Sequence, residues 1–170
     1  ATGKDMDVWI QHVSGGQAVR LTASPADEQF PSLSADGRTV CFRVTAGPEK
    51  GIYVIPALGG SPKLLVTEGF TPRISPNGKT VVYATGNVDT ASEIRAVSSE
   101  GGSYHTVATG LEMAIAPTFT PDGRQLIVWS GPRIRESREP YDFWIVPAAG
   151  GTAVRMGVID HLTRSGVQFN

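Results

Sequence analysis

Three histidines are the side chains of this sequence best suited to acid-base or metal chemistry, because imidazole titrates near neutral pH and is a common metal ligand. His12 and His105 fall near hairpin ends in predicted strands, so the simpler interpretation is that both are ordinary strand residues. His161, beside Asp160 in a predicted loop, is the best of the three candidates, with a solvated loop residue as the alternative. The sequence provides none of them with the convergent partners that a metal site or a catalytic pair needs.

The other short motifs also point away from catalysis. The Gly-x-Ser-x-Gly pattern of a serine hydrolase is absent, and the Gly-Gly pairs neither open a helix nor precede Gly-Lys-Ser/Thr. Asp5 and Asp7 alternate at the start of a strand, but no Asp-x-Asp-x-Asp-Gly calcium loop follows. Cys41 is the only cysteine and lies in an apolar strand pattern, which indicates a core residue. We therefore predict a chain that is not an enzyme, with no catalytic residues, no cofactor and no metal.

A charged loop at 131–141 carries Arg133 and Arg135. It has two interpretations: a solvated loop, which we favour, or a contact surface in which arginine side chains bind carboxylates. Glu136 and Glu139 are interleaved with the basic residues, and the net charge of the chain is −1. Because no basic, aromatic stripe is present either, we predict that nucleic acid is not a partner.

These candidates are set in a repeated pattern. The stretches Phe30–Phe42, Thr71–Tyr83 and Ala116–Trp129 each consist of a short strand, a tight turn and an apolar strand. At each turn, Pro or Ala is followed by Asp or Asn and then by Gly. Such self-similarity indicates a repeat architecture.

Two kinds of glycine turn mark every repeat. Gly37, Gly78 and Gly123 supply the left-handed residue of a type I turn closed by a bulge, so each begins a hairpin. A second hairpin turn is formed by Gly-Gly pairs flanked by extended apolar segments, at 15–16, 59–60, 101–102 and 150–151.

The turns recur about every 40 to 45 residues, which is the length of a four-stranded propeller blade. The predicted fold is all-β: a β-propeller, or a sector of one, in a single domain 1–170 of four-stranded antiparallel blades, with helix nearly absent. It has about four blade equivalents, at 5–22 combined with 165–170 as an incomplete split blade, 30–67, 70–109 and 115–157.

Composition agrees with an ordinary globular chain. The sequence has 170 residues, of which 40% are hydrophobic and 18% charged, enough for a core. No run of about 18 apolar residues is present, so we predict no membrane insertion. The chain does not begin with Met, and we expect it to be a mature or excised piece.

The combined pattern is (Ser/Thr)-Pro-(Asp/Asn)-Gly-(Lys/Arg), an apolar strand, an Ile-Tyr-Val-like strand, a Gly-Gly turn and Leu-Thr. It resembles the TolB-like, WD-repeat-like propeller family over essentially the whole chain, most closely at residues 7–42. The resemblance implies a non-catalytic protein-interaction or ligand-sensing module, part of a larger bacterial signalling or envelope protein in an extracytoplasmic, periplasmic setting. The alternative it implies is a propeller domain gating a prolyl-oligopeptidase-type serine peptidase, with the catalytic domain absent from this chain.

In such a blade the tight turns share one face of the ring. The variable connections, among them the predicted loops 23–29 and 110–115, collect on the other face, where binding concentrates. Near the axis, Arg73 is the only charge in a polar column with Ser32, Thr118 and Gln168. We predict that a protein or small-ligand partner binds the variable-loop face; a merely solvated rim is the alternative. The candidate residues are Asp27, Glu28, Arg73, Arg133, Arg135 and His161.

The predicted blades can be part of a ring in two ways. Residues 165–170 either dock beside the N-terminal hairpin to close four blades, or the chain is a sector of a ring of six to eight blades. An open sector exposes blade faces and strand edges, which favour self-association that completes the propeller. We favour the sector.

Overall fold

A computed structural model describes residues 6–86, 92–111, 113–131, 141–159 and 161 of the chain. Within these ranges every regular element is a β-strand, apart from a short helical turn that begins at Val158. No helix in the described ranges is long and apolar enough to cross a membrane. The predicted all-β class is confirmed.

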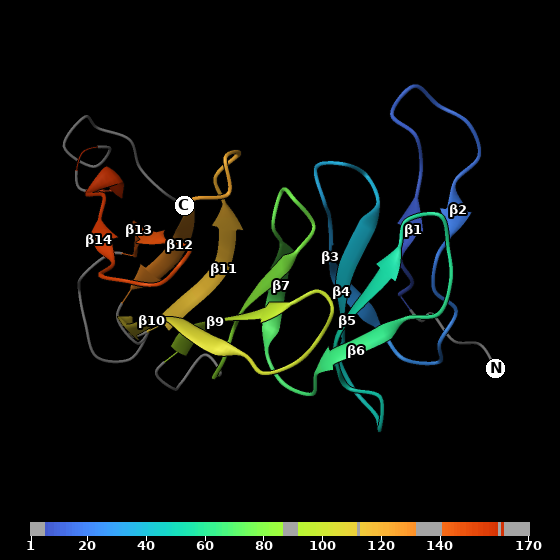
Figure 1. The fold of residues 1–170 in the computed structure, drawn as a ribbon, viewed down its shortest axis with the longest axis horizontal. Helices are drawn as coiled ribbons and strands as arrows, with labels where there is room; N and C mark the ends of the chain where they lie inside the picture. Colours follow the sequence, from blue (N-terminus) through green and yellow to red (C-terminus); the bar gives the residue numbers. More distant parts are fainter. Residues whose placement is uncertain (1–5, 87–91, 112, 132–140, 160, 162–170) are drawn as a thin grey trace.

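The strands form four antiparallel sheets of consecutive strands, named here sheets 1 to 4 (Figure 1). Sheet 1 contains β1 (Trp9–Ile10) and β2 (Val19–Arg20). Sheet 2 contains β3 (Glu28–Leu33), β4 (Thr39–Val44), β5 (Gly51–Pro56) and β6 (Lys63–Val66). Sheet 3 contains β7 (Phe70–Ile74), β8 (Thr80–Ala84), β9 (Ser92–Ser98) and β10 (His105–Leu111). Sheet 4 contains β11 (Met113–Phe119), β12 (Gln125–Gly131), β13 (Asp142–Pro147) and β14 (Val154–Arg155).

The Asp-Gly and Asn-Gly turns join the first two strands of sheets 2, 3 and 4, as predicted. Gly37, Gly78 and Gly123 have φ angles of 71°, 71° and 70°, in the left-handed region that favours glycine. The N–H of each donates to the carbonyl oxygen three residues earlier, for example from Gly37 to Ser34 at 2.9 Å. These turns lie at one end of the sheets, which we call the turn side (Figure 1).

A bulge that the sequence did not predict interrupts the first strand of each four-stranded sheet. Phe30, Thr71 and Ala116, each followed by proline, have φ angles of 55°, 47° and 50°. The register shifts at each of these positions, and pairing resumes upstream. Glu28 therefore pairs with Val44 inside β3, which corrects the expectation that 23–29 is all loop. The predicted loop 110–115 is likewise wrong at both ends, because β10 extends to residue 111 and β11 starts at 113.

The apolar core consists of three layers, one between each pair of successive sheets. Val40 and Phe42 pack toward sheet 1, whereas Cys41 and Val54 pack toward sheet 3. The layer between sheets 3 and 4 includes Val82 of sheet 3 and Leu126 and Val128 of sheet 4. Sheets 2 and 3 thus each bury one face against the sheet before and the other against the sheet after, which is how propeller blades pack.

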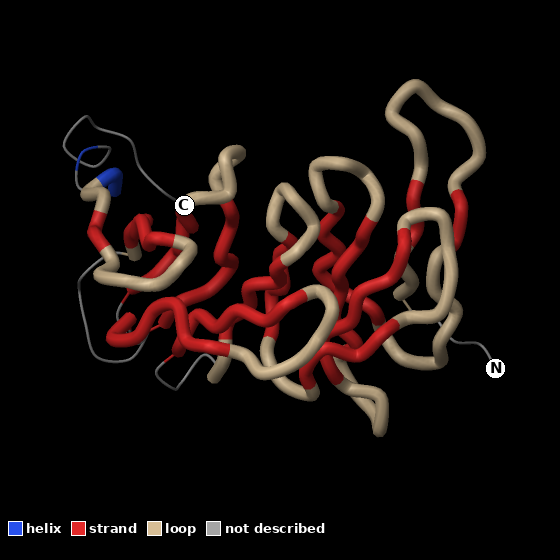
Figure 2. The backbone as a smooth tube through the Cα atoms, viewed as in Figure 1, coloured by secondary structure: helices blue, strands red, loops and turns tan. Residues whose placement is uncertain are grey.

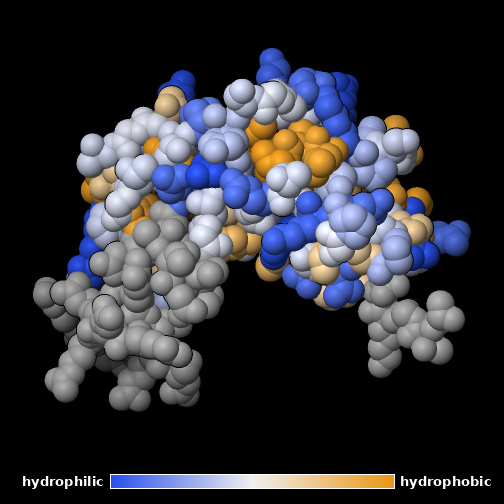
Figure 3. Space-filling model, turned by 90° about the horizontal axis from the view of Figure 1, so that it is seen from below, coloured by the Kyte–Doolittle hydropathy of each residue, from blue (hydrophilic) through white to orange (hydrophobic). Residues whose placement is uncertain are grey.

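The sheets are arranged side by side in an arc. Sheet 1 and sheet 4 lie at opposite ends of the molecule, and loops collect at both ends of the strands (Figures 1 and 2). Seen from below, the molecule is an arch with one concave side (Figure 3). The described sheets therefore form an open sector, and the predicted closing strand 165–170 lies outside the described residues.

Candidate binding site

Neighbouring first strands are joined directly between sheets. The N–H of Ile74 in β7 donates to Ser32 Oγ in β3 at 3.3 Å, and the N–H of Ala116 in β11 donates to Thr71 Oγ1 at 3.2 Å. These bonds hold β3, β7 and β11 as a rigid inner layer. Side chains on this layer therefore have fixed positions relative to one another.

Arg73 is the charged member of this inner layer. Its side chain is half-buried, and Nη1 donates to the Pro72 carbonyl oxygen at 2.8 Å. Among the described residues, Arg73 has no ion pair. Of its predicted column, Ser32 and Thr118 occupy equivalent bulged strands, and Gln168 lies outside the described residues. Arg73 therefore has guanidinium donors that no described acid occupies, on the strand between those of Ser32 and Thr118.

The other predicted site residues that the structure describes are not bonded to Arg73. Asp27 is half-buried, and its Oδ1 accepts the N–H of Met6 at 3.0 Å. His161 is exposed in the short helical turn after β14. No hydrogen bond or ion pair among the described residues joins Asp27, Arg73 and His161. Arg133 and Arg135 lie outside the described residues.

Glu28 differs most from its expected place on a binding rim. Its side chain is buried, with 4% exposure, and its carboxylate accepts hydrogen bonds from Thr22 Oγ1 at 2.7 Å and from Ser24 Oγ. Thr22 Oγ1 also accepts the N–H of Val8 at 2.8 Å. The carboxylate therefore joins the end of sheet 1 to the start of β3, on the side opposite the turns, which we call the loop side.

Three grooves of one design lie between successive sheets. Each is lined by the outer strand of one sheet, or its end, and by the segment after the Gly-Gly turn of the next sheet. Groove 1 lies between sheets 1 and 2, groove 2 between sheets 2 and 3, and groove 3 between sheets 3 and 4. Their volumes are about 440, 610 and 570 Å³.

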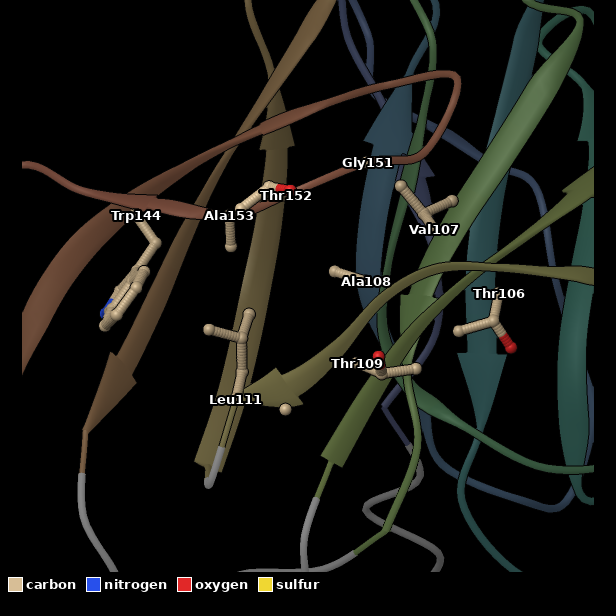
Figure 4. A pocket seen from close by; sticks show the side chains of 10 residues that line it. Thr106, Val107, Ala108, Thr109, Leu111, Trp144, Gly151, Thr152 and Ala153 are labelled. Atoms are coloured by element: carbon tan, nitrogen blue, oxygen red, sulfur yellow. The ribbon is translucent and has the colours of Figure 1, made fainter.

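Groove 3 is mainly apolar at its base. Trp144 from β13 and Leu111 and Ala108 from β10 project into it, with Ala153 opposite (Figure 4). Trp144 packs against the core layer between sheets 3 and 4. A groove of this kind, without a charged side chain among its lining residues, has no evident means of selecting a ligand.

A cation of the chain itself contacts Glu68 and Tyr104 in the lining of groove 2. Arg95 occupies the repeat position of Tyr53 and Trp144, a departure visible in the sequence. Its Nε bonds Glu93 Oε2 at 2.9 Å, its Nη1 pairs with Glu68, and its guanidinium lies 4.4 Å from the centre of the Tyr104 ring. Burial lowers the pKa of Arg95, the bond to Glu93 raises it, and the net direction is upward. Two carboxylates and an aromatic ring thus stabilise this cation.

Metal binding, thiol chemistry and histidine chemistry have little support among the described residues. No three His, Cys, Asp or Glu residues there lie close enough together to hold a metal ion. Burial raises the pKa of the Cys41 thiol to about 12, so this side chain stays protonated in the core. His12 Nδ1 lies 2.6 Å from Ser14 Oγ at the exposed first hairpin, and His105 is exposed on β10.

Consecutive four-stranded sheets, packed face to face around a concave side, define the class of protein: a β-propeller. In structure the chain is similar to TolB from Acinetobacter baumannii, with a TM-score of 0.72, 19% identity and coverage of 88% of this chain and 37% of that one. It is also similar to the β-propeller domain of the Trilobed protease from Pyrococcus furiosus, with a TM-score of 0.59, 21% identity and coverage of 76% and 43%.

In sequence the chain is 28% identical over 159 residues to Tricorn protease homolog 1 of Streptomyces coelicolor, which covers 89% of this chain and 14% of that protein. No protein-family model matches. The chain thus has a TolB-like β-propeller fold and spans less than half the length of each of these three proteins.

Proposed function

We propose that this chain is a non-catalytic protein-interaction or ligand-sensing module of a larger bacterial signalling or envelope protein. Its partner binds the loop side and the inner layer, with Arg73 as the anchoring residue. The observation that carries the proposal is that Arg73 is half-buried on a rigid strand and has no ion pair among the described residues. A guanidinium held in this way is suited to a carboxylate, because its fork of N–H donors can bind both oxygens.

The remaining predicted residues are proposed as contributors. Asp27 and His161 are accessible in part, and Arg133 and Arg135 belong to the charged loop of 131–141. A location outside the cytoplasm is proposed on the basis of the TolB-like fold.

The proposal can be tested with a peptide library displayed on phage and panned against the purified chain. Selected peptides should carry carboxylates, and their affinity should fall about tenfold in Arg73→Gln, which is the loss of one charged hydrogen-bonding group. Arg38→Gln, on the turn side, is the matched control and should bind normally. If affinity is insensitive to Arg73 and to Arg133→Glu with Arg135→Glu, but falls in Arg38→Gln, the binding face has been placed on the wrong side.

A second candidate function is a propeller domain that gates a serine peptidase. The similarity to the propeller domain of the Trilobed protease and to Tricorn protease homolog 1 favours it. The test is the coding sequence around this chain: a Gly-x-Ser-x-Gly segment downstream supports the peptidase, and a kinase, winged-helix or membrane-anchoring segment upstream supports the interaction module.

We also propose that the isolated chain associates head to tail with a second copy. Trp129 and Phe143, paired across β12 and β13, are 39% and 37% exposed on the outer face of sheet 4. At the other end Trp9, which shares the repeat position of Tyr53 and Trp144, is 56% exposed on sheet 1. Inside the chain these two kinds of face pack on each other, so the end of one copy fits the start of the next.

Sedimentation analysis tests this association. A concentration-dependent dimer or ring is expected, and Trp129→Asp should shift it to monomer. A wild-type chain that stays monomeric at every concentration would exclude the second copy as the occupant of these faces.

A further inference from the structure

Groove 1 contains a buried carboxylate. Glu28 lines the groove, is 4% exposed and receives two hydroxyl hydrogen bonds, from Thr22 and Ser24. Among the described residues, no Lys, Arg or His lies within ion-pair distance of it. Removing a carboxylate from water without a cation is unfavourable, so groove 1 has a strong preference for a positively charged occupant.

This acid has no counterpart in the repeats. The equivalent position is Gly69 in sheet 3 and Ala114 in sheet 4. A Cβ at Gly69 would overlap the ring of Tyr83, and Ala114 is fully buried. Only groove 1 therefore has the room for a long side chain here, and the chain places a carboxylate in it.

The walls of groove 1 also suit a cation. Phe42 and Tyr53 lie in its lining with their rings stacked, 5.7 Å between centroids and 17° between planes. Glu49 adds a second acidic residue to the lining, and its main-chain carbonyl accepts the Tyr53 hydroxyl at 2.7 Å. Aromatic faces attract guanidinium and ammonium groups, most strongly where water is partly excluded.

Groove 2 indicates that acidic and aromatic side chains together bind a guanidinium group. There, carboxylates of Glu68 and Glu93 and the ring of Tyr104 surround the guanidinium of Arg95. Groove 1 has carboxylates and aromatic rings at the corresponding place between the preceding pair of sheets, with Tyr53 at the repeat position of Arg95. What groove 1 lacks, relative to groove 2, is the guanidinium.

We propose that groove 1 is a binding site for a guanidinium side chain, an arginine supplied by a protein partner. The arginine pairs with Glu28 and lies against the ring of Tyr53, which stacks on the buried ring of Phe42. This inference rests on the proposed interaction function, because it adds a second anchor of opposite charge to Arg73 on the same partner. The groove is bordered by the loop-side segments 21–24 and by Glu49, on the side where the proposed partner binds.

The test uses the full chain and two small probes, acetyl-arginine amide and its uncharged isostere acetyl-citrulline amide, in an NMR titration of backbone amides. The arginine probe should give saturable shifts at Thr22, Ser24 and Tyr53, and the citrulline probe should give none. Glu28→Gln should weaken binding at least about tenfold, while Glu100→Gln, an exposed acid beyond the groove, should leave it unchanged.

Equal binding by the citrulline probe, or by Glu28→Gln with a native-like spectrum, would overturn the proposal, as would the absence of saturable shifts. If Glu28→Gln fails to fold, Tyr53→Leu removes part of the aromatic wall and should weaken the arginine probe severalfold; unchanged affinity would again overturn it. The small probes do not require the partner, so their failure is distinguishable from a failure of peptide selection at Arg73.

Discussion

Grooves 1 and 2 are built from equivalent segments of successive repeats, and they differ in how charge is balanced. At groove 2 the carboxylates of Glu68 and Glu93 share one guanidinium, that of Arg95 of the same chain. In groove 1 the carboxylate of Glu28 has hydroxyl donors but no cation among the described residues. A repeat can thus keep its backbone while one groove has an internal ion pair and another has a buried acid without a cation among the described residues.

The largest effect is expected where groove 2 has no room for the side chain found in groove 1. Gly69 has a φ angle of 99°, and a Cβ there would overlap Tyr83 and lie 3.1 Å from Ile52 Cδ1. Gly69→Val should therefore lower the free energy of unfolding by about 3–5 kcal/mol, from backbone strain and overpacking together. Urea denaturation measures this.

Gly47→Val is the matched control. Its φ angle is 82°, but no atom lies within 4 Å of the added Cβ, so only strain of about 1–2 kcal/mol applies. Equal losses at the two positions would mean that packing against Tyr83 does not distinguish the two grooves.

Removing the internal cation should make groove 2 resemble groove 1. Arg95→Ala leaves Glu68 and Glu93 close together without their shared partner. The expected loss of stability is about 1–3 kcal/mol, discounted because both acids are partly exposed. Acetyl-arginine amide should then shift the amides of Glu68 and Tyr104, which it leaves unchanged in the wild type. A wild-type response at these amides would contradict the view that groove 2 is already filled.

Glu28→Gln should change stability only slightly. The amide oxygen can still accept one hydroxyl hydrogen bond in place of the carboxylate, so the free energy of unfolding should change by less than about 1 kcal/mol. Thermal and urea unfolding measure this change. A loss of several kcal/mol would show that the carboxylate of Glu28 is needed for folding. Its burial in groove 1 would then no longer indicate a binding site.

The smallest effect is expected on the turn side, where the repeats are nearly alike. The Ser34 hydroxyl, and then the N–H of Arg38, lower the pKa of Asp36, and the Thr120 hydroxyl and its neighbours do the same for Asp122. Because these values are lower in the folded chain, the carboxylates stabilise it above the ordinary aspartate pKa of about 3.9. That contribution is lost as the pH falls through the folded values.

Sheet 3 contains its own control for this effect. Asn77 makes the equivalent bonds to Ser75 and to the N–H of Lys79 and does not titrate. Replacing both aspartates by Asn should therefore flatten the fall of stability in acid, measured by thermal unfolding from pH about 5 to 2. If the fall of stability in acid were unchanged, the charges of the two aspartates would not contribute to the stability of the fold.

The turn side was largely predictable and the loop side was not. Turn glycines such as Gly78 can be recognised in the sequence, because a tight turn requires a left-handed residue within four consecutive positions. The bulge at Phe30 has no such local requirement, since Thr71 and Ala116 adopt the same backbone with unrelated side chains. Because this bulge was not predicted, Glu28 was expected to be an exposed loop residue, whereas its side chain is buried.

The candidate site shows the same division. The isolated charge of Arg73 and the departure of Arg95 from an apolar column were both visible in the sequence. The sequence did not show that Arg73 has no ion pair among the described residues, nor that Arg95 pairs with Glu68 as well as with nearby Glu93, because folding brings distant positions together. Glu68 lies 27 residues before Arg95, for instance.

By itself, the sequence determined the repeat, the hairpins and the all-β class, because each depends on residues a few positions apart and on alternation along a strand. Only the tertiary structure decided which polar side chains are buried, paired or left with uncompensated charge. The packing of sheet 1 against sheet 2 buries Glu28 with its neighbours Thr22 and Ser24, and no cation among the described residues pairs with that carboxylate. Charge balance depends on the distance between groups in space, and the packing of whole sheets sets that distance.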